Sequence, residues 1–75
     1  MKLSILNSKE TIFEKDAKSV VLPGEDGQLC VMDYHEPFLY KLKTGQILVD
    51  DKFAINIVGG IARMKGNELV VLLEQ

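Results

Sequence analysis

Large apolar residues recur at every second position along three short stretches of this sequence, residues 3–5, 38–42 and 53–57. Because successive side chains of a β-strand point to opposite faces, this alternation is typical of a strand with one buried face. We therefore predict strands in these stretches. The side chains predicted to point inward are Leu3, Ile5, Phe38, Tyr40, Leu42, Phe53, Ile55 and Ile57.

Three further stretches, residues 20–22, 29–32 and 69–73, are largely apolar on both faces. Strands of this kind are covered on both sides, so one face should meet the core and the other becomes a candidate contact with another protein. Residues 69–73 also fit a helical stripe, but the stretch is short, contains β-branched residues and follows a turn, which favours a strand. No longer window shows a clean helical period, so we expect little or no helix.

Turn-forming residues separate these stretches at short intervals. Examples are Asn7-Ser8, Pro23-Gly24, Asp26-Gly27, Thr44-Gly45, Asp50-Asp51 and Gly59-Gly60. Closely spaced turns between short strands indicate an all-β sandwich or barrel. The 75 residues form one domain, residues 1–75. A core of this size seldom yields more than about 3–5 kcal/mol of net stability, so stabilisation by a partner is a reasonable expectation.

Composition and charge exclude several classes of function. The net charge of −2 and the lack of a Lys/Arg cluster argue against a nucleic-acid partner. The one cysteine rules out a disulfide within the chain and fits a reducing compartment. The longest apolar run, residues 69–73, is far shorter than the roughly 20 residues of a membrane helix, so we expect no direct insertion into a bilayer.

Candidate chemistry is sparse, and we predict no catalytic, cofactor-binding or metal-binding residues. His35 is the one histidine, and we interpret it as a corner residue whose ring hydrogen-bonds the backbone. Cys30 is expected to be a small buried hydrophobe. The pair Gly59-Gly60 lacks the spacing of a phosphate loop and predicts a bulge or a close approach of strands. Residues 50–52 are expected to form a solvated hairpin turn.

Residues 19–37, SVVLPGEDGQLCVMDYHEP, resemble the N-terminal β-sandwich domain of the epsilon subunit of F-type ATP synthases. That family reads roughly S-V-x-L-P-G-x-x-G-x-L-G-(I/V)-x-P-x-H-x-P-(L/F)-L. Matching positions are Ser19, Val20, Leu22, Pro23, Gly24, Gly27, Leu29, Val31, His35, Pro37, Phe38 and Leu39. The segments at residues 1–14, 42–45, 59–61 and 67–72 resemble the family in the same order, so the resemblance covers nearly the whole chain.

Some positions depart from the family's pattern. Cys30 stands where glycine is usual, and Asp33-Tyr34 replaces a segment that usually holds proline or glycine. The sequence ends at Gln75, where the family's β-sandwich domain ends. The resemblance therefore implies that the C-terminal helical hairpin is absent, together with the hairpin's regulation of ATP hydrolysis.

The resemblance implies a small two-sheet β-sandwich of about eight to ten short strands. It also implies a non-catalytic central-stalk subunit that helps couple ion-driven rotation to ATP synthesis, at the cytoplasmic face of the bacterial plasma membrane. Its partners would be the gamma subunit and the loops of the c-ring. The residues expected to contact the c-ring are Glu25, Asp26, Gly27 and Gln28, and those expected to contact the gamma subunit are Met32, His35 and Leu39.

Two alternatives belong to other classes. A biotinyl or lipoyl carrier domain is also a small β-sandwich and needs a lysine on an exposed hairpin beside methionine, which Met64-Lys65 partly satisfies. However, Lys65 lies near the end of the sequence, whereas the carrier's lysine lies mid-chain, and a second methionine is missing. A generic β module for protein interaction would share the exposed apolar face without binding a rotor subunit.

Overall fold

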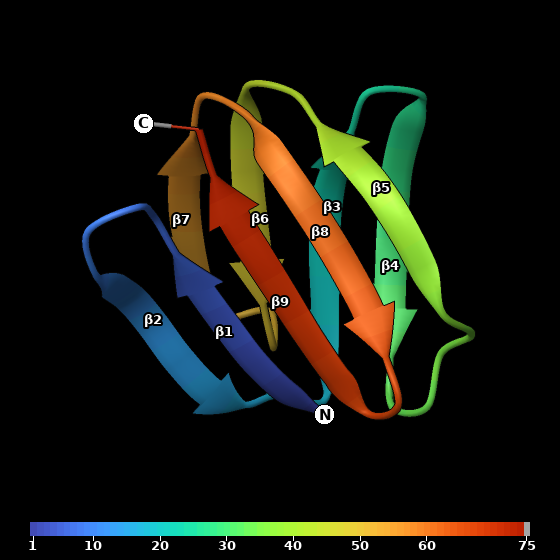
Figure 1. The fold of residues 1–75 in the computed structure, drawn as a ribbon. Coiled ribbons are helices and arrows are strands. Elements are labelled where there is room, and N and C mark those ends of the chain that lie inside the picture. Colours follow the sequence, from blue (N-terminus) through green and yellow to red (C-terminus); the bar gives the residue numbers. More distant parts are fainter. Residues whose placement is uncertain (75) are drawn as a thin grey trace.

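The computed structural model describes residues 1–74 and contains nine β-strands and no helix over that range (Figure 1). The strands are β1 (Lys2–Leu6), β2 (Thr11–Asp16), β3 (Ser19–Gly24), β4 (Gly27–Met32), β5 (Phe38–Leu42), β6 (Gly45–Val49), β7 (Phe53–Ile57), β8 (Gly60–Lys65) and β9 (Glu68–Leu73). Gln75 lies outside the described residues. The predictions of an all-β fold and of a strand at residues 69–73 are confirmed.

The strands form two layers that face each other. One layer has the order β2-β1-β9-β8-β5, and the other consists of β3 between β4 and β6, with β7 beyond β6. Figure 1 shows β8 and β9 crossing in front of β6 and β3. The layers join where β3 meets β5 through the single pair Gly24 and Leu42. Neighbouring strands are antiparallel except β1 and β9, which are parallel. The predicted two-sheet sandwich is thus confirmed. Strand pairing between β3 and β5 joins its two layers into one continuous sheet.

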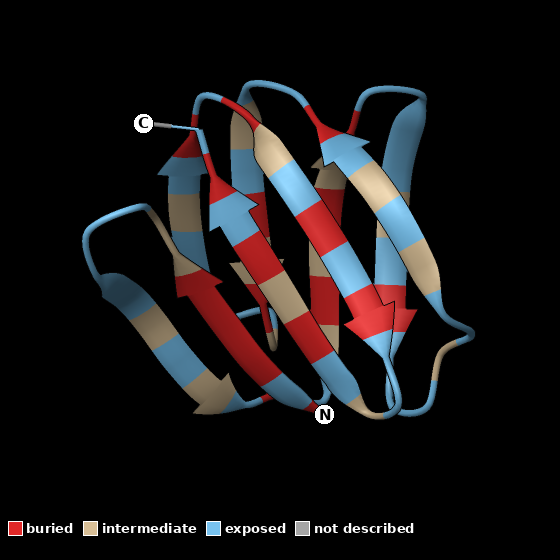
Figure 2. Ribbon diagram, in the orientation of Figure 1, coloured by how far each residue is buried: buried red, intermediate tan, exposed pale blue. Residues whose placement is uncertain are grey.

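The core lies between the layers and follows the period of two. Figure 2 shows buried and exposed bands alternating along the central strands. Buried side chains come from both layers, among them Leu3, Ile5, Val20, Leu22, Val31, Ile47, Val49, Ala62, Met64, Leu69 and Val71. Leu42 and Ile57 are buried as predicted, and Phe38, Tyr40 and Ile55 pack against the cluster. The prediction that Phe53 points inward is wrong, because it begins β7, the last strand of its layer. Phe53 is 41% exposed, and its ring packs on that of Phe13 with centroids 5.5 Å apart.

The structure corrects two expectations about β3 and β4. Pro23 and Gly24 continue β3 and pair with Gln28 and Gly27, so the connection consists of residues 25–26 alone. Cys30 is exposed, so its prediction as a buried residue is wrong. Because, among the strands of residues 1–74, β4 pairs only with β3, it is an edge strand. Cys30 occupies the side of its pleat opposite Val31, which faces the core.

The strands with two apolar faces bury only one of them in the isolated chain. On β9, Leu69 and Val71 are buried whereas Leu72 is 49% exposed, and on β4 Met32 is 58% exposed. The core therefore covers one face of each strand. The other face is open in this chain, as expected for a candidate partner surface.

Since the strands alternate in direction, their connections gather at two ends of the sandwich. The tip end comprises residues 7–10, 25–26, 43–44 and 58–59. The N-terminal end comprises Met1 and residues 17–18, 33–37, 50–52 and 66–67. Strand β4 runs from the first end to the second, so the residues predicted to contact the c-ring and the corner that carries His35 lie at opposite ends of one strand (Figure 1).

Candidate interaction surfaces at the two ends of the sandwich

The β3–β4 hairpin forms a narrow exposed projection at the tip end. Glu25, Asp26, Gly27 and Gln28 are all exposed, and the tight connection brings them together at the end of the strands. Backbone bonds hold the base of the hairpin against β5, because Glu25 N donates to Lys41 O at 2.9 Å and Lys43 N donates to Pro23 O at 2.9 Å. The residues predicted to contact the c-ring therefore form one continuous surface.

The shape of this hairpin depends on the close contact between Gly24 and Tyr40. A Cβ atom on Gly24 would collide with the Tyr40 ring and would lie 2.5 Å from Gly27 O. The Tyr40 hydroxyl donates to Gly27 O at 3.2 Å. Glycine is needed here so that the hairpin can lie directly on the aromatic ring.

The tip carries two acidic residues, Glu25 and Asp26, and two exposed lysines, Lys41 and Lys43, lie on the neighbouring β5 end. Lys41 Nζ lies 3.7 Å from Glu25 Oε2, with both side chains exposed to solvent. An exposed pair of this kind contributes about 0–1 kcal/mol to stability. Asp26, at the very tip, carries the carboxylate that suits a basic or amide-rich partner.

The β4–β5 connection, residues 33–37, forms the corner that carries His35. Tyr34 has a positive φ of 60°, and its amide donates to Asn67 Oδ1 at 2.8 Å. His35 N donates to Met32 O at 3.1 Å, and His35 Nδ1 lies 2.9 Å from Glu36 O. The His35 ring meets the Phe38 ring edge-on with centroids 5.3 Å apart. The predicted corner role of His35, with its ring bonded to the backbone, is confirmed.

Met32 and Leu39 flank this corner on opposite faces of the molecule. Met32 is 58% exposed and Leu39 is 72% exposed. Met32 alternates with the buried Val31 on β4, and Leu39 alternates with the inward-facing Tyr40 on β5, so each points outward from its own layer. A partner that touches both must reach around the rim formed by β4 and β5, past His35. Contact of these three residues with a gamma subunit stays a prediction.

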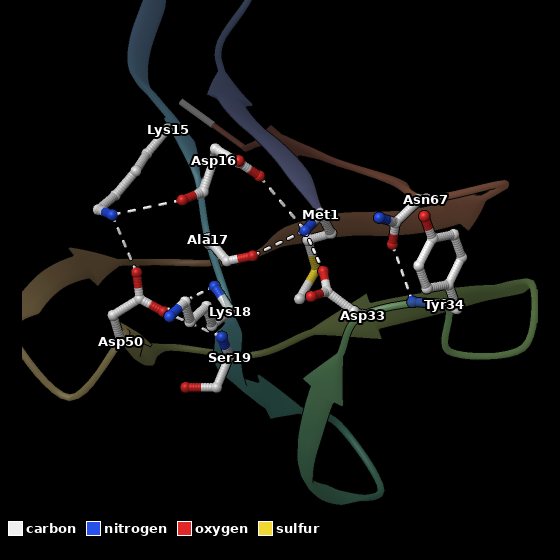
Figure 3. A network of polar contacts seen from close by, with 10 residues as sticks. All are labelled: Met1, Lys15, Asp16, Ala17, Lys18, Ser19, Asp33, Tyr34, Asp50 and Asn67. Atoms are coloured by element: carbon white, nitrogen blue, oxygen red, sulfur yellow. Dashed lines mark hydrogen bonds and ion pairs between the residues drawn. The ribbon is translucent and has the colours of Figure 1, made fainter.

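A polar network at the N-terminal end joins the chain's first residue to this corner (Figure 3). The Met1 ammonium donates to Ala17 O at 2.7 Å and to Asp33 Oδ1, and it lies 3.5 Å from Asp16 Oδ1. The Asp33 hydrogen bond is the main cause that raises the pKa of the Met1 ammonium above its ordinary value. The same bond lowers the pKa of Asp33. Sequence reasoning missed this network, because residues 1 and 33 share no local pattern.

Asp50 forms a second part of this network and joins the β6–β7 turn to the start of β3. Its Oδ1 accepts from Lys18 N at 2.8 Å and from Ser19 N at 3.0 Å, and Lys15 Nζ lies 3.0 Å from its Oδ2. These contacts, with the Ser19 bond first, lower the pKa of Asp50 to about 2. The predicted hairpin turn is correct, but Asp50 is more than a solvated turn residue. Asp50 has a positive φ of 52°, a conformation that aspartate tolerates at turns.

Other chemistry is limited within residues 1–74. No three His, Cys, Asp or Glu side chains of that range converge as metal ligands do. The part of the chain that the structure describes contains no helix long and apolar enough to cross a bilayer. Met64, which the carrier alternative requires beside Lys65, is buried with 1% of its surface exposed, so it does not flank that lysine on the surface.

This geometry defines a small two-layer β-sandwich with separate surfaces at its two ends. The sequence model of one protein family, described as the beta-sandwich domain of the ATP synthase Delta/Epsilon chain, matches residues 1–75. The chain therefore belongs to the ATP synthase delta/epsilon family, as the sequence resemblance indicated.

Individual relatives agree with this assignment. The ATP synthase epsilon chain of Trichodesmium erythraeum is 35% identical over 72 residues, covering 92% of this chain and 53% of that protein. ATP synthase epsilon chain 2 of Ralstonia nicotianae is 30% identical over 76 residues, covering 96% of this chain and 55% of that protein. The chain spans about half the length of these curated relatives.

Solved structures share the fold at low sequence identity. A chain from the central stalk and c-ring structure of Tetrahymena thermophila mitochondrial ATP synthase superposes with a TM-score of 0.82 at 11% identity, covering 99% of this chain and 63% of that one. A chain from the Euglena gracilis mitochondrial ATP synthase structure gives a TM-score of 0.82 at 18% identity, with coverages of 97% and 49%.

Proposed function

We propose that this chain is a non-catalytic subunit of the central stalk of an F-type ATP synthase, where it binds the gamma subunit and the c-ring and helps couple ion-driven rotation to ATP synthesis. The observation that carries the proposal is the match of residues 1–75 to the delta/epsilon β-sandwich family. The similar Tetrahymena chain comes from a central stalk and c-ring assembly. The expected location is peripheral, at the cytoplasmic face of a bacterial plasma membrane.

The architecture suits a part that transmits torque. Close-packed protein interiors have low compressibility, and the core here receives side chains from both layers. The two predicted contact surfaces lie at the two ends of β4 (Gly27–Met32), roughly 20 Å apart along a strand that rises about 3.3 Å per residue. A stiff body with two separate surfaces can hold one partner at each end and resist shear between them.

The gamma contact can be tested by co-purification and gel filtration with the gamma subunit from the same source. A specific interface buries roughly 1,200–2,000 Å², so the complex should survive gel filtration. Leu39→Asp should weaken or abolish it, because the change places a charge where the apolar contact is predicted. Ile12→Asp is the matched control, since Ile12 is also exposed but lies on β2, the opposite edge strand of the same layer.

The two variants separate the outcomes. Loss of binding by Leu39→Asp alone, with both variants folded, supports the proposed surface. Equal loss in both variants would move the interface away from the β4/β5 rim. A wild-type chain that elutes alone in the presence of the gamma subunit would contradict the central-stalk proposal.

The c-ring contact needs the assembled complex in membrane vesicles. Charge reversal by Glu25→Lys together with Asp26→Lys should reduce ATP-driven ion pumping, because the acidic tip would no longer suit a basic or amide-rich loop. Glu68→Lys reverses one exposed carboxylate at the N-terminal end and should leave pumping unchanged. Unchanged pumping in the tip variant would remove residues 25–28 from the interface.

A further inference from the structure

The outer edge of β4 (Gly27–Met32) is open. Figure 1 shows β4 as the outermost strand of its layer, and among the strands of residues 1–74 it pairs only with β3. An open edge presents unpaired backbone N–H and C=O groups, and proteins usually block such an edge with charged side chains, proline or a bulge. Strand β4 has none of these devices, because its sequence is GQLCVM and its register with β3 is regular over six pairs.

The other edge strands carry more protection. Strand β2 contains Glu14, Lys15 and Asp16, and a register shift interrupts its pairing with β1. Strand β7 is also uncharged, but it is one residue shorter than β4 and follows the charged turn that contains Asp51 and Lys52. Among the edge strands of residues 1–74, β4 is therefore the longest that lacks a charged residue.

Two observations show which backbone groups of β4 point away from β3. Pro23 pairs with Gln28 but has no N–H, so the two residues cannot exchange both bonds of a hydrogen-bonded pair. Met32 O accepts from His35 N, so it also points away from β3. Because hydrogen-bonded and non-hydrogen-bonded pairs alternate along an antiparallel ladder, the outward groups are those of Gln28, Cys30 and Met32. All three residues are exposed.

We propose that β4 is a self-association edge, at which two copies of this chain pair antiparallel about a two-fold axis. The register that uses all the outward groups pairs Cys30 with Cys30 of the second copy, and Gln28 with Met32 of the second copy. A second copy fits this edge because identical strands in this register satisfy one another's donors and acceptors, and an uncharged strand meets no like charge. At each end of the pairing, Asp26 of one copy approaches Tyr34 of the other, whose side chain is 79% exposed and whose hydroxyl can donate to a carboxylate.

The contact between two edge strands is small, so the association should depend on concentration. Interfaces that bury less than about 1,200 Å² are typically weak and transient. Under reducing conditions, sedimentation equilibrium of the free chain should give a mass that rises from one chain to two as the concentration increases. A single-chain mass at every concentration up to about 1 mM would overturn the proposal.

Cys30→Pro removes the central outward N–H without removing a bond to β3. Proline is tolerated in an edge strand where the N–H faces solvent. The variant should associate roughly tenfold more weakly or worse, because the two-fold axis turns one lost donor into two lost hydrogen bonds. Cys30→Ser is the matched control, since it keeps the N–H and should associate like the wild type. Undiminished association of a folded Cys30→Pro chain would overturn the proposal.

Disulfide trapping tests the register and does not require the proline variant to fold. In the proposed register the two Cys30 Cα atoms lie about 5.5 Å apart, within the range of a disulfide. Diamide takes two electrons and two protons from a pair of facing thiols, which join as a disulfide while the diamide becomes a hydrazine. The wild-type chain should therefore crosslink rapidly at Cys30.

Two relocated cysteines are the controls for this trapping. In a Cys30→Ser background, Gln28→Cys places the two thiols roughly 13 Å apart along the paired strands, and Ala54→Cys places an exposed thiol on β7. Both chains should crosslink roughly tenfold more slowly than the wild type, because their thiols meet only by random collision. Equal rates in all three chains, or the fastest rate in Ala54→Cys, would overturn the proposal.

The consequence for assembly rests on the proposed function. Strand β4 carries predicted c-ring contacts at Gly27 and Gln28 and a predicted gamma contact at Met32, so self-association covers residues of both surfaces. The Cys30-linked dimer should therefore fail to bind the gamma subunit until dithiothreitol cleaves the disulfide. A linked dimer that binds gamma as tightly as the reduced chain would overturn this consequence. Failure of the reduced chain to bind gamma would instead count against the central-stalk function and leave the self-association in place.

Discussion

The two ends of the sandwich are stabilised by different interactions. The N-terminal end uses ionised groups: the Met1 ammonium with Asp33, and Asp50 with the Lys18 and Ser19 amides. Apart from the exposed Lys41–Glu25 ion pair, the tip end uses close packing and neutral hydrogen bonds, such as Gly24 on the Tyr40 ring and Thr44 Oγ1 donating to Val58 O at 2.9 Å. One end should therefore respond to pH and charge, whereas the other should respond to side-chain volume.

The largest effect is expected at the tip end from Gly24→Ala. The new Cβ would collide with the Tyr40 ring and with Gly27 O, and overpacking of this kind costs about 2–3 kcal/mol. Urea unfolding of the variant should show a midpoint far below that of the wild type. In a domain of about 3–5 kcal/mol, such a loss would leave about 0–3 kcal/mol of net stability.

Gly66→Ala is the control for this prediction. Gly66 has a positive φ of 62°, but a Cβ atom there would meet nothing within 4 Å. The substitution should cost about 1 kcal/mol from backbone strain alone. A Gly24→Ala variant that is more stable than Gly66→Ala would show that packing on Tyr40 does not govern the tip end.

Acid should loosen the N-terminal end first. The pKa of Asp50 is lowered to about 2, so its stabilising effect is present above the ordinary aspartate value of about 3.9 and is lost as the pH falls toward about 2. Asp33, whose pKa is also lowered, acts in the same direction. Amide exchange, corrected for its intrinsic pH dependence, should show Lys18 and Ser19 losing protection before Glu25 and Lys43.

Asp50→Asn separates the charge from the hydrogen bonds. Asparagine keeps a side-chain oxygen for the two amides and tolerates positive φ, but it does not ionise. The variant should be less stable than wild type near neutral pH and should lose less stability between pH values of about 4 and 2. Asp26→Asn, at the tip end, should leave the acid slope unchanged. If the stability of the Asp50→Asn variant falls with acid as steeply as that of the wild type, Asp50 is not the source of the acid sensitivity.

The sequence predicted the features of this structure that depend on local patterns, and it missed those that depend on contacts between distant residues. The period of two predicted the strands and the inward direction of Leu3, Leu42 and Ile57, because each strand's pattern is local. The prediction of a buried Cys30 is wrong because nothing local in the sequence shows that the face of β4 opposite Val31 is uncovered. The pair Pro23-Gly24 predicts a turn because such pairs usually form turns, whereas contact with β5 keeps both residues in β3.

For the same reason, the sequence predicted some parts of the candidate surfaces and missed others. The family resemblance identified residues 25–28 and the His35 corner, and the structure shows both as accessible features. The contacts of Met1 with Asp33, and of Asp50 with Ser19, join residues about thirty positions apart. No periodicity or turn signal encodes such pairs, so they emerge only when the connections at one end are brought together.

A smaller effect is expected from Thr44→Val at the tip end. The substitution removes the neutral bond from Thr44 Oγ1 to Val58 O while keeping the side-chain volume nearly constant. Because the hydroxyl is exposed and water can replace it, the loss should be about 0.5–1 kcal/mol. Urea midpoints measured at neutral and acidic pH should fall by similar amounts. A loss confined to acidic pH would break the assignment of neutral interactions to this end.

The smallest effect should come from Asp51→Gly, which changes the backbone strain of the β6–β7 turn and leaves the charged contacts of Asp50 in place. Asp51 has a positive φ of 54°, a conformation that costs roughly 1–2 kcal/mol for an ordinary L-residue and less for aspartate. Glycine relieves this strain but gains freedom in the unfolded chain, so the net stabilisation should be about 0.5 kcal/mol. Asp51→Ala should destabilise instead. The urea midpoint of Asp51→Gly should rise while its acid slope stays that of the wild type, because Asp50 keeps its partners. A changed slope would show that shape and charge are not separable at this end.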